Sequence, residues 1–191
     1  MCAKRGLDTQ TILAAAAELA EERGLENVSL LQVAEKLGVK SPSLYNHLNG
    51  MQDISSGIAK LALSRLEDAI RNAAVGRSKE DALLAIAFSY RKFAKANPEL
   101  YKAILRFPDC HDAGTQEAGH AVVRILYQVM EPYSFSKEER LHFARAFRSA
   151  LHGFVSLEAA GFFQSSGANV DESYVQLVSR LILTLHPAEV N

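Results

Sequence analysis

The stretch "GVKSPSLYNHL", residues 38 to 48, decides how the first part of this 191-residue chain folds. Gly38 permits a tight turn, the Ser41 hydroxyl can cap a following helix, and Pro42 suits the first helical position, where its missing N–H is no loss. The helix predicted for residues 42 to 48 is too short to be stable alone. It must therefore pack against neighbouring helices, as the second half of a helix-turn-helix does.

Two amphipathic helices are predicted before this stretch. Asp8 or Thr9 can cap the first helix, and Gly24 is placed to end it. Ser29 precedes a second, shorter run of apolar residues at helical spacing, which Gly38 ends. These two helices provide the surface on which the short third helix can rest.

The third helix has an apolar side and a polar edge. Leu44 and Leu48 are expected to face the first two helices. The polar edge offers hydroxyl, amide, imidazole and ammonium groups, which suit phosphate oxygens and base edges. The alternative is an ordinary polar surface on a small three-helix unit. The residues of this edge are Lys40, Ser41, Ser43, Tyr45, Asn46 and His47.

Composition and charge restrict the class of protein. With 48% apolar and 23% charged residues the chain resembles a soluble globular protein, and no uninterrupted apolar run is long enough to span a membrane. Cys2 and Cys110 cannot build a disulfide framework, which favours a reducing compartment and a cytoplasmic location. The formal net charge of −1 provides no general attraction to nucleic acid, so DNA binding would depend on where the charges are placed.

Residues 11 to 54, "TILAAAAELAEERGLENVSLLQVAEKLGVKSPSLYNHLNGMQDI", resemble the DNA-binding domain of TetR-type transcriptional repressors. Two positions depart from the family's pattern, because Met51 stands where lysine is usual and Leu48 where phenylalanine is usual. The missing lysine removes one expected phosphate contact and implies a modest affinity for DNA. The positions that match the pattern in register are Gly24, Val28, Val33, Ala34, Leu37, Gly38, Val39, Leu44, Tyr45, His47 and Leu48.

The resemblance also implies roles for single residues. Ser29 would cap the second helix over a phosphate, and Tyr45 and His47 would bond to the DNA backbone. Ser41, Ser43 and Asn46 would approach the bases, and a flexible arm carrying Lys4 and Arg5 would add backbone or minor-groove contacts. The predicted DNA-binding residues are Lys4, Arg5, Ser29, Lys40, Ser41, Pro42, Ser43, Tyr45, Asn46 and His47.

The remainder of the chain is also predicted to be helical, which makes the fold class all-α. A helix-turn-helix DNA-binding domain of residues 1–50 would be joined by a connector helix, residues 51–75, to a ligand-binding and dimerisation domain of residues 76–191. The clearest boundary is "VGRS", residues 75 to 78, where Gly76 ends one helix and Ser78 opens the next. A long rigid connector can carry a small displacement from one domain to the other.

A long helix is predicted from Ser136, which can form a capping box with Glu139, to about Phe163. A helix with a groove of small residues on one face and a bulky stripe on the other must be covered on both. This favours a four-helix bundle between two subunits, as in the TetR family; the alternative is that the groove receives a helix of the same chain. The bulky stripe is Ala144, Phe147, Leu151, Val155 and Phe162.

The last helix, predicted from an Asp171 cap to Leu185, is apolar enough to join this bundle. In addition, "LHGFVSLEAAGFF", residues 151 to 163, resembles the His-Gly-containing subgroup of TetR carboxyl-terminal domains. The predicted dimer interface consists of Ser149, Gly153, Ser156, Ala160, Tyr174, Val178 and Leu181.

The resemblance implies a homodimeric repressor that binds a near-palindromic operator. It would be released when a small apolar or aromatic molecule binds the carboxyl-terminal domain, where helical bundles tend to hold cavities. For each aromatic candidate the alternative is that the side chain only fills the core. The candidate ligand-binding residues are Phe88, Phe107, His120, Tyr127, Phe147, Arg148 and His152.

An enzyme is the alternative class. Glu117 with His120 and Glu139 with His142 have the Glu-x-x-His spacing of di-iron helical bundles. Such a site needs two further inward glutamates, and Glu158 is the only obvious one, while Glu139 already has a capping role. Because the sequence also contains no glycine-rich phosphate loop, Cys-x-x-Cys pair or serine nucleophile elbow, we predict a protein that is not an enzyme and needs no cofactor.

Overall fold

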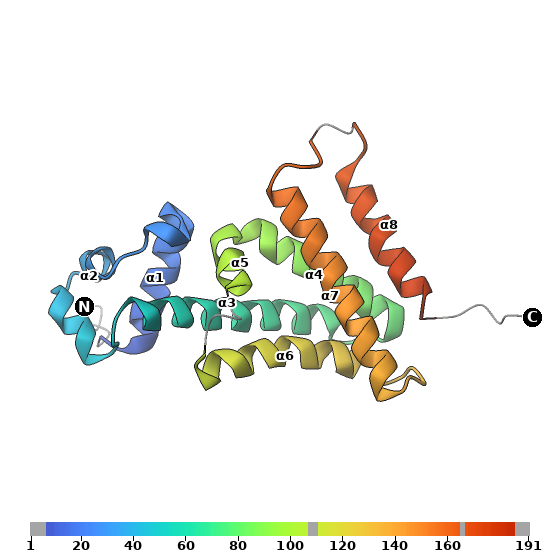
Figure 1. Ribbon diagram of the computed structural model, residues 1–191, viewed down its shortest axis with the longest axis horizontal. Helices are drawn as coiled ribbons and strands as arrows, with labels where there is room; N and C mark the ends of the chain where they lie inside the picture. The colour runs from blue at the N-terminus through green and yellow to red at the C-terminus, as the bar shows by residue number, and fades with distance from the viewer. Residues whose placement is uncertain (1–6, 107–110, 165–166, 186–191) are drawn as a thin grey trace, which may run out of the picture. The chain divides into compact units, whose positions relative to one another are not determined.

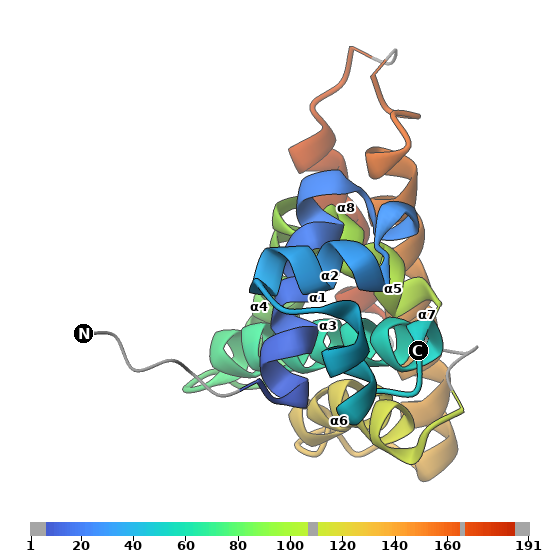
Figure 2. The same ribbon diagram turned by 90° about the vertical axis from the view of Figure 1, so that its left-hand side faces the viewer.

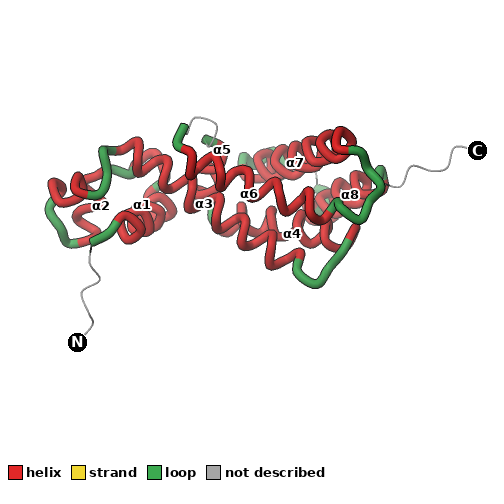
Figure 3. The backbone as a smooth tube through the Cα atoms, turned by 90° about the horizontal axis from the view of Figure 1, so that it is seen from below, coloured by secondary structure: helices red, strands yellow, loops and turns green. Residues whose placement is uncertain are grey.

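The computed structural model describes residues 7–106, 111–164 and 167–185 (Figure 1). All regular structure within these ranges is helical (Figure 3), which confirms the predicted all-α class. None of the helices in these ranges is long and apolar enough to cross a membrane. The elements, with η marking 3₁₀ helices, are α1 (Thr9–Arg23), η1 (Leu25–Asn27), α2 (Leu30–Leu37), η2 (Ser41–Asn46), α3 (Met51–Ala74), α4 (Lys79–Ala96), α5 (Pro98–Leu105), α6 (Ala113–Val129), α7 (Lys137–Ala159) and α8 (Val170–Leu183).

The chain forms two compact units. The first unit contains Met1–Arg65 and Asn97–Gly119, and the second contains Leu66–Ala96 and His120–Asn191. Helices α3 and α6 therefore contribute residues to both units. The helix-turn-helix lies entirely in the first unit.

In the first unit, α1 and α2 pack against each other and are seen at the front of Figure 2. Asp8 caps α1 by accepting a hydrogen bond of 2.7 Å from the Thr11 N–H, and α1 ends before Gly24, whose φ is +92°. Both features confirm the predicted limits of the first helix. The shared core of the first unit includes Ile12, Ala16, Leu19, Val33, Ala34, Leu44, Leu48, Ile54, Ile58 and Ala62.

Helix α2 has the ends that its sequence predicts. The Gln32 N–H donates to the Ser29 hydroxyl, and the Gln32 side-chain carbonyl accepts from the Ser29 N–H, which completes a capping box. Gly38 ends the helix in the left-handed conformation at φ +66°. The positions of Leu44 and Leu48 in the core confirm that the following segment is held against these helices.

The segment after this turn differs from the predicted α-helix. It is the 3₁₀ helix η2, in which Lys40 is the N-cap residue, no side chain caps the first turn, and Pro42 is the second helical residue. The prediction that the Ser41 hydroxyl caps this helix is therefore wrong. The segment is only six residues long and is bounded by the Gly38 turn and the buried Leu48, and short helical pieces commonly adopt the tighter 3₁₀ form.

Helix α5 belongs to the core of the first unit, which the sequence did not indicate. The Glu21 carboxylate on α1 accepts a hydrogen bond of 2.8 Å from the Leu100 N–H in the first turn of α5. In return the Glu99 carboxylate on α5 accepts one of 2.8 Å from the Leu25 N–H of η1. With Leu100 and Ala103 buried in the same core as α1 and α2, these reciprocal bonds fix α5 on the helix-turn-helix.

The second unit is built on mutual contacts among α4, α7 and α8. Helix α7 begins with the predicted capping box, in which the Ser136 N–H donates to Glu139 and lowers the pKa of its carboxyl group. Four members of the predicted bulky stripe are buried, namely Ala144, Phe147, Leu151 and Val155.

The prediction that Phe162 is the fifth member of this buried stripe is wrong, because Phe162 is 69% exposed. Helix α7 ends at Ala159, short of the predicted Phe163, and Gly161 then turns the chain with φ +80°. Glycine adopts this left-handed conformation at little cost, so the helix ends there despite the apolar residues that follow.

Two other helix limits also differ from those predicted. Asn169, and not Asp171, caps α8, because its side-chain oxygen accepts from the Asp171 and Glu172 N–H groups. Helix α8 also ends at Leu183, before the predicted Leu185. Helix α6 begins at Ala113, and the Asp112 carboxylate caps it by accepting a 2.8 Å hydrogen bond from the Thr115 N–H.

Candidate nucleic-acid interface

The predicted DNA-binding edge is exposed and rests on buried anchors. Leu44 and Leu48 are buried in the first unit, while Tyr45 between them is 59% exposed and Asn46 and His47 are also exposed. Ser43 and Asn46 are three residues apart, which places them above one another on a 3₁₀ helix. The polar side chains therefore project from a backbone that the core holds in place.

Ser29 already has a partner within the chain. Its hydroxyl donates to the Gln32 side-chain oxygen at 2.9 Å as part of the capping box. The positive end of the α2 dipole lies at this turn, and this is where a phosphate is favoured. If a phosphate binds here, both the positive end of the α2 dipole and the Ser29 hydroxyl group would contribute.

Acidic side chains of α1 offset the positive charge of Lys36 on α2. The Lys36 ammonium lies 2.7 Å from Glu22 and 3.2 Å from Glu18 on α1. The hydrogen bond from Lys36 lowers the pKa of the Glu22 carboxyl group, so this carboxylate stays ionised at neutral pH. The charge of Lys36 is thus balanced within the chain, which agrees with the modest DNA affinity that the sequence predicts.

The start of α3 also lacks a cation. Met51, at the position where the family usually has lysine, is exposed. The Asp53 carboxylate accepts hydrogen bonds of 2.8 and 2.9 Å from the backbone and side-chain N–H groups of Asn49. An anion therefore occupies the positive end of this helix dipole. Lys4 and Arg5 lie outside the described residues.

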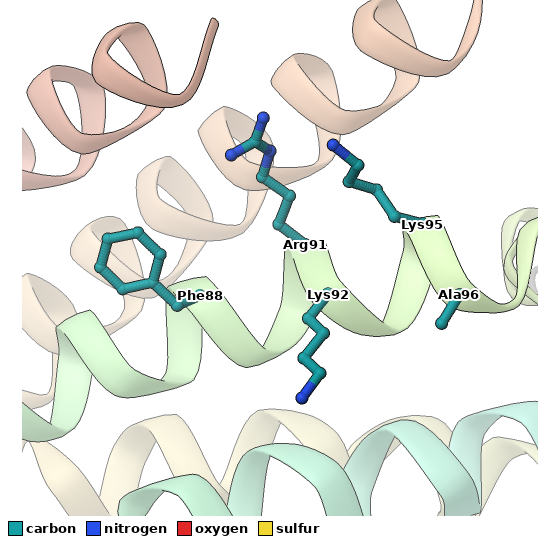
Figure 4. A pocket seen from close by; sticks show the side chains of 5 residues that line it. All are labelled: Phe88, Arg91, Lys92, Lys95 and Ala96. Carbon is teal, nitrogen blue, oxygen red and sulfur yellow. The ribbon is translucent and has the colours of Figure 1, made fainter.

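The predicted ligand-binding residues do not form one cluster. Phe88 lines an open pocket of about 430 Å³ on α4, together with Arg91, Lys92, Lys95 and Ala96 (Figure 4). Of the other predicted ligand-binding residues that the structure describes, none lines this pocket. Phe147 is 1% exposed and packs in the core of the second unit, so it offers no surface to this pocket.

The other predicted ligand-binding residues are scattered over the second unit. His120 and Arg148 are exposed, whereas Tyr127 and His152 are half-buried. Burial lowers the pKa of His152, and the nearby Arg148 charge acts in the same direction, so the neutral imidazole is favoured. Phe107 lies outside the described residues.

Sequence reasoning missed Arg91, a buried polar residue of the second unit that contacts side chains of α7 and α8. Arg91 is 7% exposed, and its guanidinium donates to both Glu158 oxygens, at 2.8 and 2.6 Å, and lies 2.7 Å from the Asp171 carboxylate. Its central carbon lies 4.8 Å from the Tyr174 ring centroid. Arg91 thus joins α4 to α7 and α8. One available signal was its place on the buried side of α4, four residues after Ala87.

The small-residue groove of α7 faces away from the core of the chain. Ser149 and Ala160 are exposed, and Gly153 and Ser156 are half-buried. A Cβ atom added to Gly153 would meet no atom within 4 Å. The Ser156 hydroxyl is buried without a hydrogen-bond partner in the part of the chain that the structure describes.

Two of the predicted interface residues on α8 point inward instead. Tyr174 and Val178 are fully buried within the chain, and the Tyr174 hydroxyl donates to the Ala87 carbonyl at 2.6 Å. They are packed in the core of their own subunit and cannot cover a partner, so their assignment to the interface is wrong. Leu181 is half-buried and lines an open groove of about 790 Å³ along α8.

The residues of the metal-site alternative do not form a ligand set. Glu117, His120, Glu139 and His142 are all exposed, and the inward Glu158 is paired with Arg91. Among the described residues no three histidine, cysteine or acidic side chains are close enough to hold a metal ion together. The structure therefore does not favour the di-iron alternative.

Known proteins resemble the chain in both of its parts. Residues 12–55 match the family of bacterial regulatory proteins called the tetR family, and residues 83–181 match the tetracyclin repressor-like carboxyl-terminal domain. The HTH-type transcriptional regulator YobS of Bacillus subtilis (strain 168) is 34% identical over 165 residues, which cover 86% of this chain and 85% of YobS.

Two further proteins are similar over nearly the full chain. An HTH-type transcriptional regulator of Mycobacterium tuberculosis is 29% identical over 180 residues, which cover 92% of this chain and 80% of that protein. The solved structure of a protein from Rhodococcus sp. RHA1 is 25% identical, covers 92% of this chain and 93% of its own, and superimposes with a TM-score of 0.77. Since two family matches and a close relative agree with the anchored helix-turn-helix, the chain belongs to the TetR family and is a DNA-binding transcriptional regulator, not an enzyme.

Proposed function

We propose that this regulator is a cytoplasmic homodimer that represses transcription from a near-palindromic operator and is released by a small aromatic or apolar effector bound in its second unit. The observation that carries the proposal is the exposed edge of Tyr45, Asn46 and His47 on the buried anchors Leu44 and Leu48. A rigidly held polar edge can enter a DNA groove without a further cost of ordering its backbone.

The individual roles follow from the chemistry of these side chains. The Tyr45 hydroxyl and the His47 imidazole are suited to phosphate oxygens, and Asn46 can form paired hydrogen bonds with an adenine edge. Two such segments in a dimer must reach successive major grooves about 34–36 Å apart, which makes the operator a near-palindrome. The supporting contacts would come from Ser29, Lys40, Ser41, Pro42, Ser43 and the arm with Lys4 and Arg5.

Two substitutions on this edge test the proposal. Tyr45→Phe removes only a hydroxyl group at a phosphate, so we expect weaker binding to every DNA sequence alike. Asn46→Ala removes a base contact, so we expect a loss of about 1–3 kcal/mol and a relaxed preference at one position in each half-site. The measurement is fluorescence anisotropy with an operator selected from a random DNA pool and with its single-base variants.

Tyr127→Phe and Asn72→Ala are the matched controls, since both residues lie outside the helix-turn-helix. They should bind operator as tightly as the parent. If Tyr45→Phe and Asn46→Ala also match the parent in affinity and base preference, the assignment of this edge to DNA fails.

Apolar residues on α7, α8 and the turn between them support the proposed dimer. Leu157, Phe162, Val175 and Leu183 are exposed, and the groove along α8 is lined in part by Leu177 and Leu181. In Figure 1 α7 and α8 lie side by side, as their mutual contacts require. A second copy of the chain would cover these side chains and the open space at Gly153.

The substitution Gly153→Leu tests this interface. In a single chain the added side chain starts in open space, so the fold of each subunit should survive. Between two closely packed helices the same side chain would overpack the contact. We expect sedimentation velocity to show monomers at concentrations where the parent is a dimer, with the helical circular dichroism unchanged.

Ala159→Leu is the matched control. It lies six residues farther along α7, which places it about 120° away around the helix. This variant should remain dimeric. An undisturbed and equally stable dimer of Gly153→Leu would show that the subunits meet elsewhere.

The proposal of a small effector is supported at the level of the fold. A TetR variant from Acinetobacter baumannii AYE has been solved in complex with minocycline and superimposes on this chain with a TM-score of 0.67 at 19% identity. That protein holds a small molecule within the same type of fold. For this chain we propose that the effector contacts Phe88, which lines the open pocket on α4.

A further inference from the structure

The open pocket on α4 combines an aromatic ring with three cationic side chains. Phe88, Arg91, Lys92 and Lys95 line it within two turns of one helix, and its volume is about 430 Å³. Figure 4 shows Arg91 and Lys95 extending to one side of α4 and Lys92 to the other. The pocket therefore lies along α4, with cationic side chains on two sides of this helix. Its volume falls within the range of small-molecule sites.

The three cations are not equally available to a ligand. The Arg91 guanidinium is already held by Glu158 and Asp171. The Lys95 ammonium lies 3.2 Å from the same Glu158 oxygen but its side chain is 57% exposed, so it can turn toward a second anion. Lys92 is exposed and forms no ion pair with any described carboxylate. The uncompensated charge thus belongs to the two lysines.

Phe88 supplies the apolar side of the pocket. Phe88 is 42% exposed, and its ring packs against Tyr174 with ring centroids 5.9 Å apart and an interplanar angle of 71°. The contact with Tyr174 holds the ring in place while part of its surface remains open to the pocket. A planar aromatic group laid on this surface would remove apolar area from water on both molecules.

We propose that this pocket binds an aromatic carboxylate, with its ring against Phe88 and its carboxylate met by the ammonium groups of Lys92 and Lys95, two exposed side chains that lie on opposite sides of α4 and turn toward the bound anion. The inference rests on the proposed function, because it takes this ligand to be the effector. The proposed function calls for an aromatic or apolar effector, and the pocket further indicates that the effector carries a negative charge. Charge-assisted hydrogen bonds to two lysines distinguish the carboxylate from a neutral molecule of the same shape. Arg91 keeps its carboxylate partners and holds the adjoining helices in place.

The test compares naphthoate with naphthamide, a neutral molecule of nearly the same shape. We expect isothermal titration calorimetry in the absence of DNA to show that the parent binds naphthoate about 10-fold more tightly than naphthamide. The double variant Lys92→Gln/Lys95→Gln should lose about 10-fold in affinity for naphthoate and little for naphthamide. Both differences should shrink at an ionic strength of roughly 1 M, where exposed charges are screened.

Lys79→Gln/Lys137→Gln is the matched control, because it removes two exposed lysines of the second unit that do not line the pocket. It should bind naphthoate like the parent. The inference is overturned if naphthoate does not bind at millimolar concentration, if it binds no better than naphthamide, or if the Lys92→Gln/Lys95→Gln variant binds it as tightly as the parent.

A second titration, with operator DNA present, separates this inference from the proposed function. Binding that depends on Lys92 and Lys95 but leaves operator affinity unchanged supports the pocket and contradicts the release mechanism. Release of operator by naphthoate that is equally strong in the double variant supports effector release and contradicts this pocket.

Discussion

Arg91→Met is expected to lower the free energy of unfolding by about 3 kcal/mol. The substitution leaves the Glu158 carboxylate, with a side chain only 16% exposed, without its two hydrogen bonds from the guanidinium. We expect the lower end of the range for broken buried ion pairs because Lys95 still reaches Glu158. Urea denaturation followed by circular dichroism measures the change, at one fixed protein concentration because dimerisation adds to apparent stability.

Two variants separate the ion pair from its surroundings. Lys95→Gln removes an exposed partner of Glu158 and should cost less than about 1 kcal/mol. The double variant Arg91→Met/Glu158→Leu removes the stranded charge and should recover much of the loss, since apolar pairs can replace buried ion pairs. A fully stable Arg91→Met protein would show that the network of Arg91, Glu158 and Asp171 contributes nothing to stability.

The pH dependence of stability provides an independent measure of the same ion pair. The hydrogen bonds from Arg91 lower the pKa of Glu158 below its ordinary value of 4.5. A carboxyl group whose pKa is lower in the folded state stabilises the fold at pH values above its unfolded pKa, and this contribution is lost as the pH falls through the folded pKa. The parent should therefore lose stability below about pH 4.5 more steeply than Arg91→Met does.

Phe147→Ala should destabilise the protein by about 3–5 kcal/mol, the typical cost of removing a buried aromatic side chain. Phe147 is among the most deeply buried large residues of the second unit, and its ring stacks on Phe143 with centroids 5.6 Å apart. Its removal leaves a cavity that the packed helices can fill only in part. Thermal and urea denaturation, again at fixed protein concentration, measure the loss.

Phe147→Leu provides the graded comparison, because it keeps most of the apolar volume and should cost clearly less than the alanine variant. Phe88→Ala changes the α4 pocket, where the ring is already partly exposed, and should affect naphthoate binding more than stability. If Phe147→Ala were as stable as the parent and altered only effector binding, Phe147 would line a ligand cavity, as its sequence pattern first suggested.

The sequence by itself determined the class of fold and most of the helix ends. The capping boxes of Ser29 with Gln32 and of Ser136 with Glu139 join residues three apart, so the chain specifies them locally. The end of α2 is also specified locally, because Gly38 adopts a left-handed backbone conformation that favours glycine. The inward positions of Leu44 and Leu48 follow from their helical spacing.

Local sequence patterns predicted helix type and capping residues less reliably where neighbouring residues are equally suitable. The segment before Leu48 has serine, proline and asparagine in an order that fits an α-helical start, yet it forms a 3₁₀ helix held between a turn and two buried anchors. In the same way Asn169 caps α8 although Asp171 was an equally suitable residue. The choice between such neighbours depends on how the flanking chain enters the helix.

Only the tertiary structure decided which residues from distant parts of the chain meet. Arg91 and Glu158 are 67 positions apart, and Glu21 lies 79 positions before Leu100, the residue whose N–H it binds. Helical periodicity shows that a side chain faces inward, but it contains no information about which helix lies opposite. For this reason Phe147 and Phe88 looked alike in the sequence, whereas packing buried Phe147 in the core and left Phe88 at the edge of a pocket.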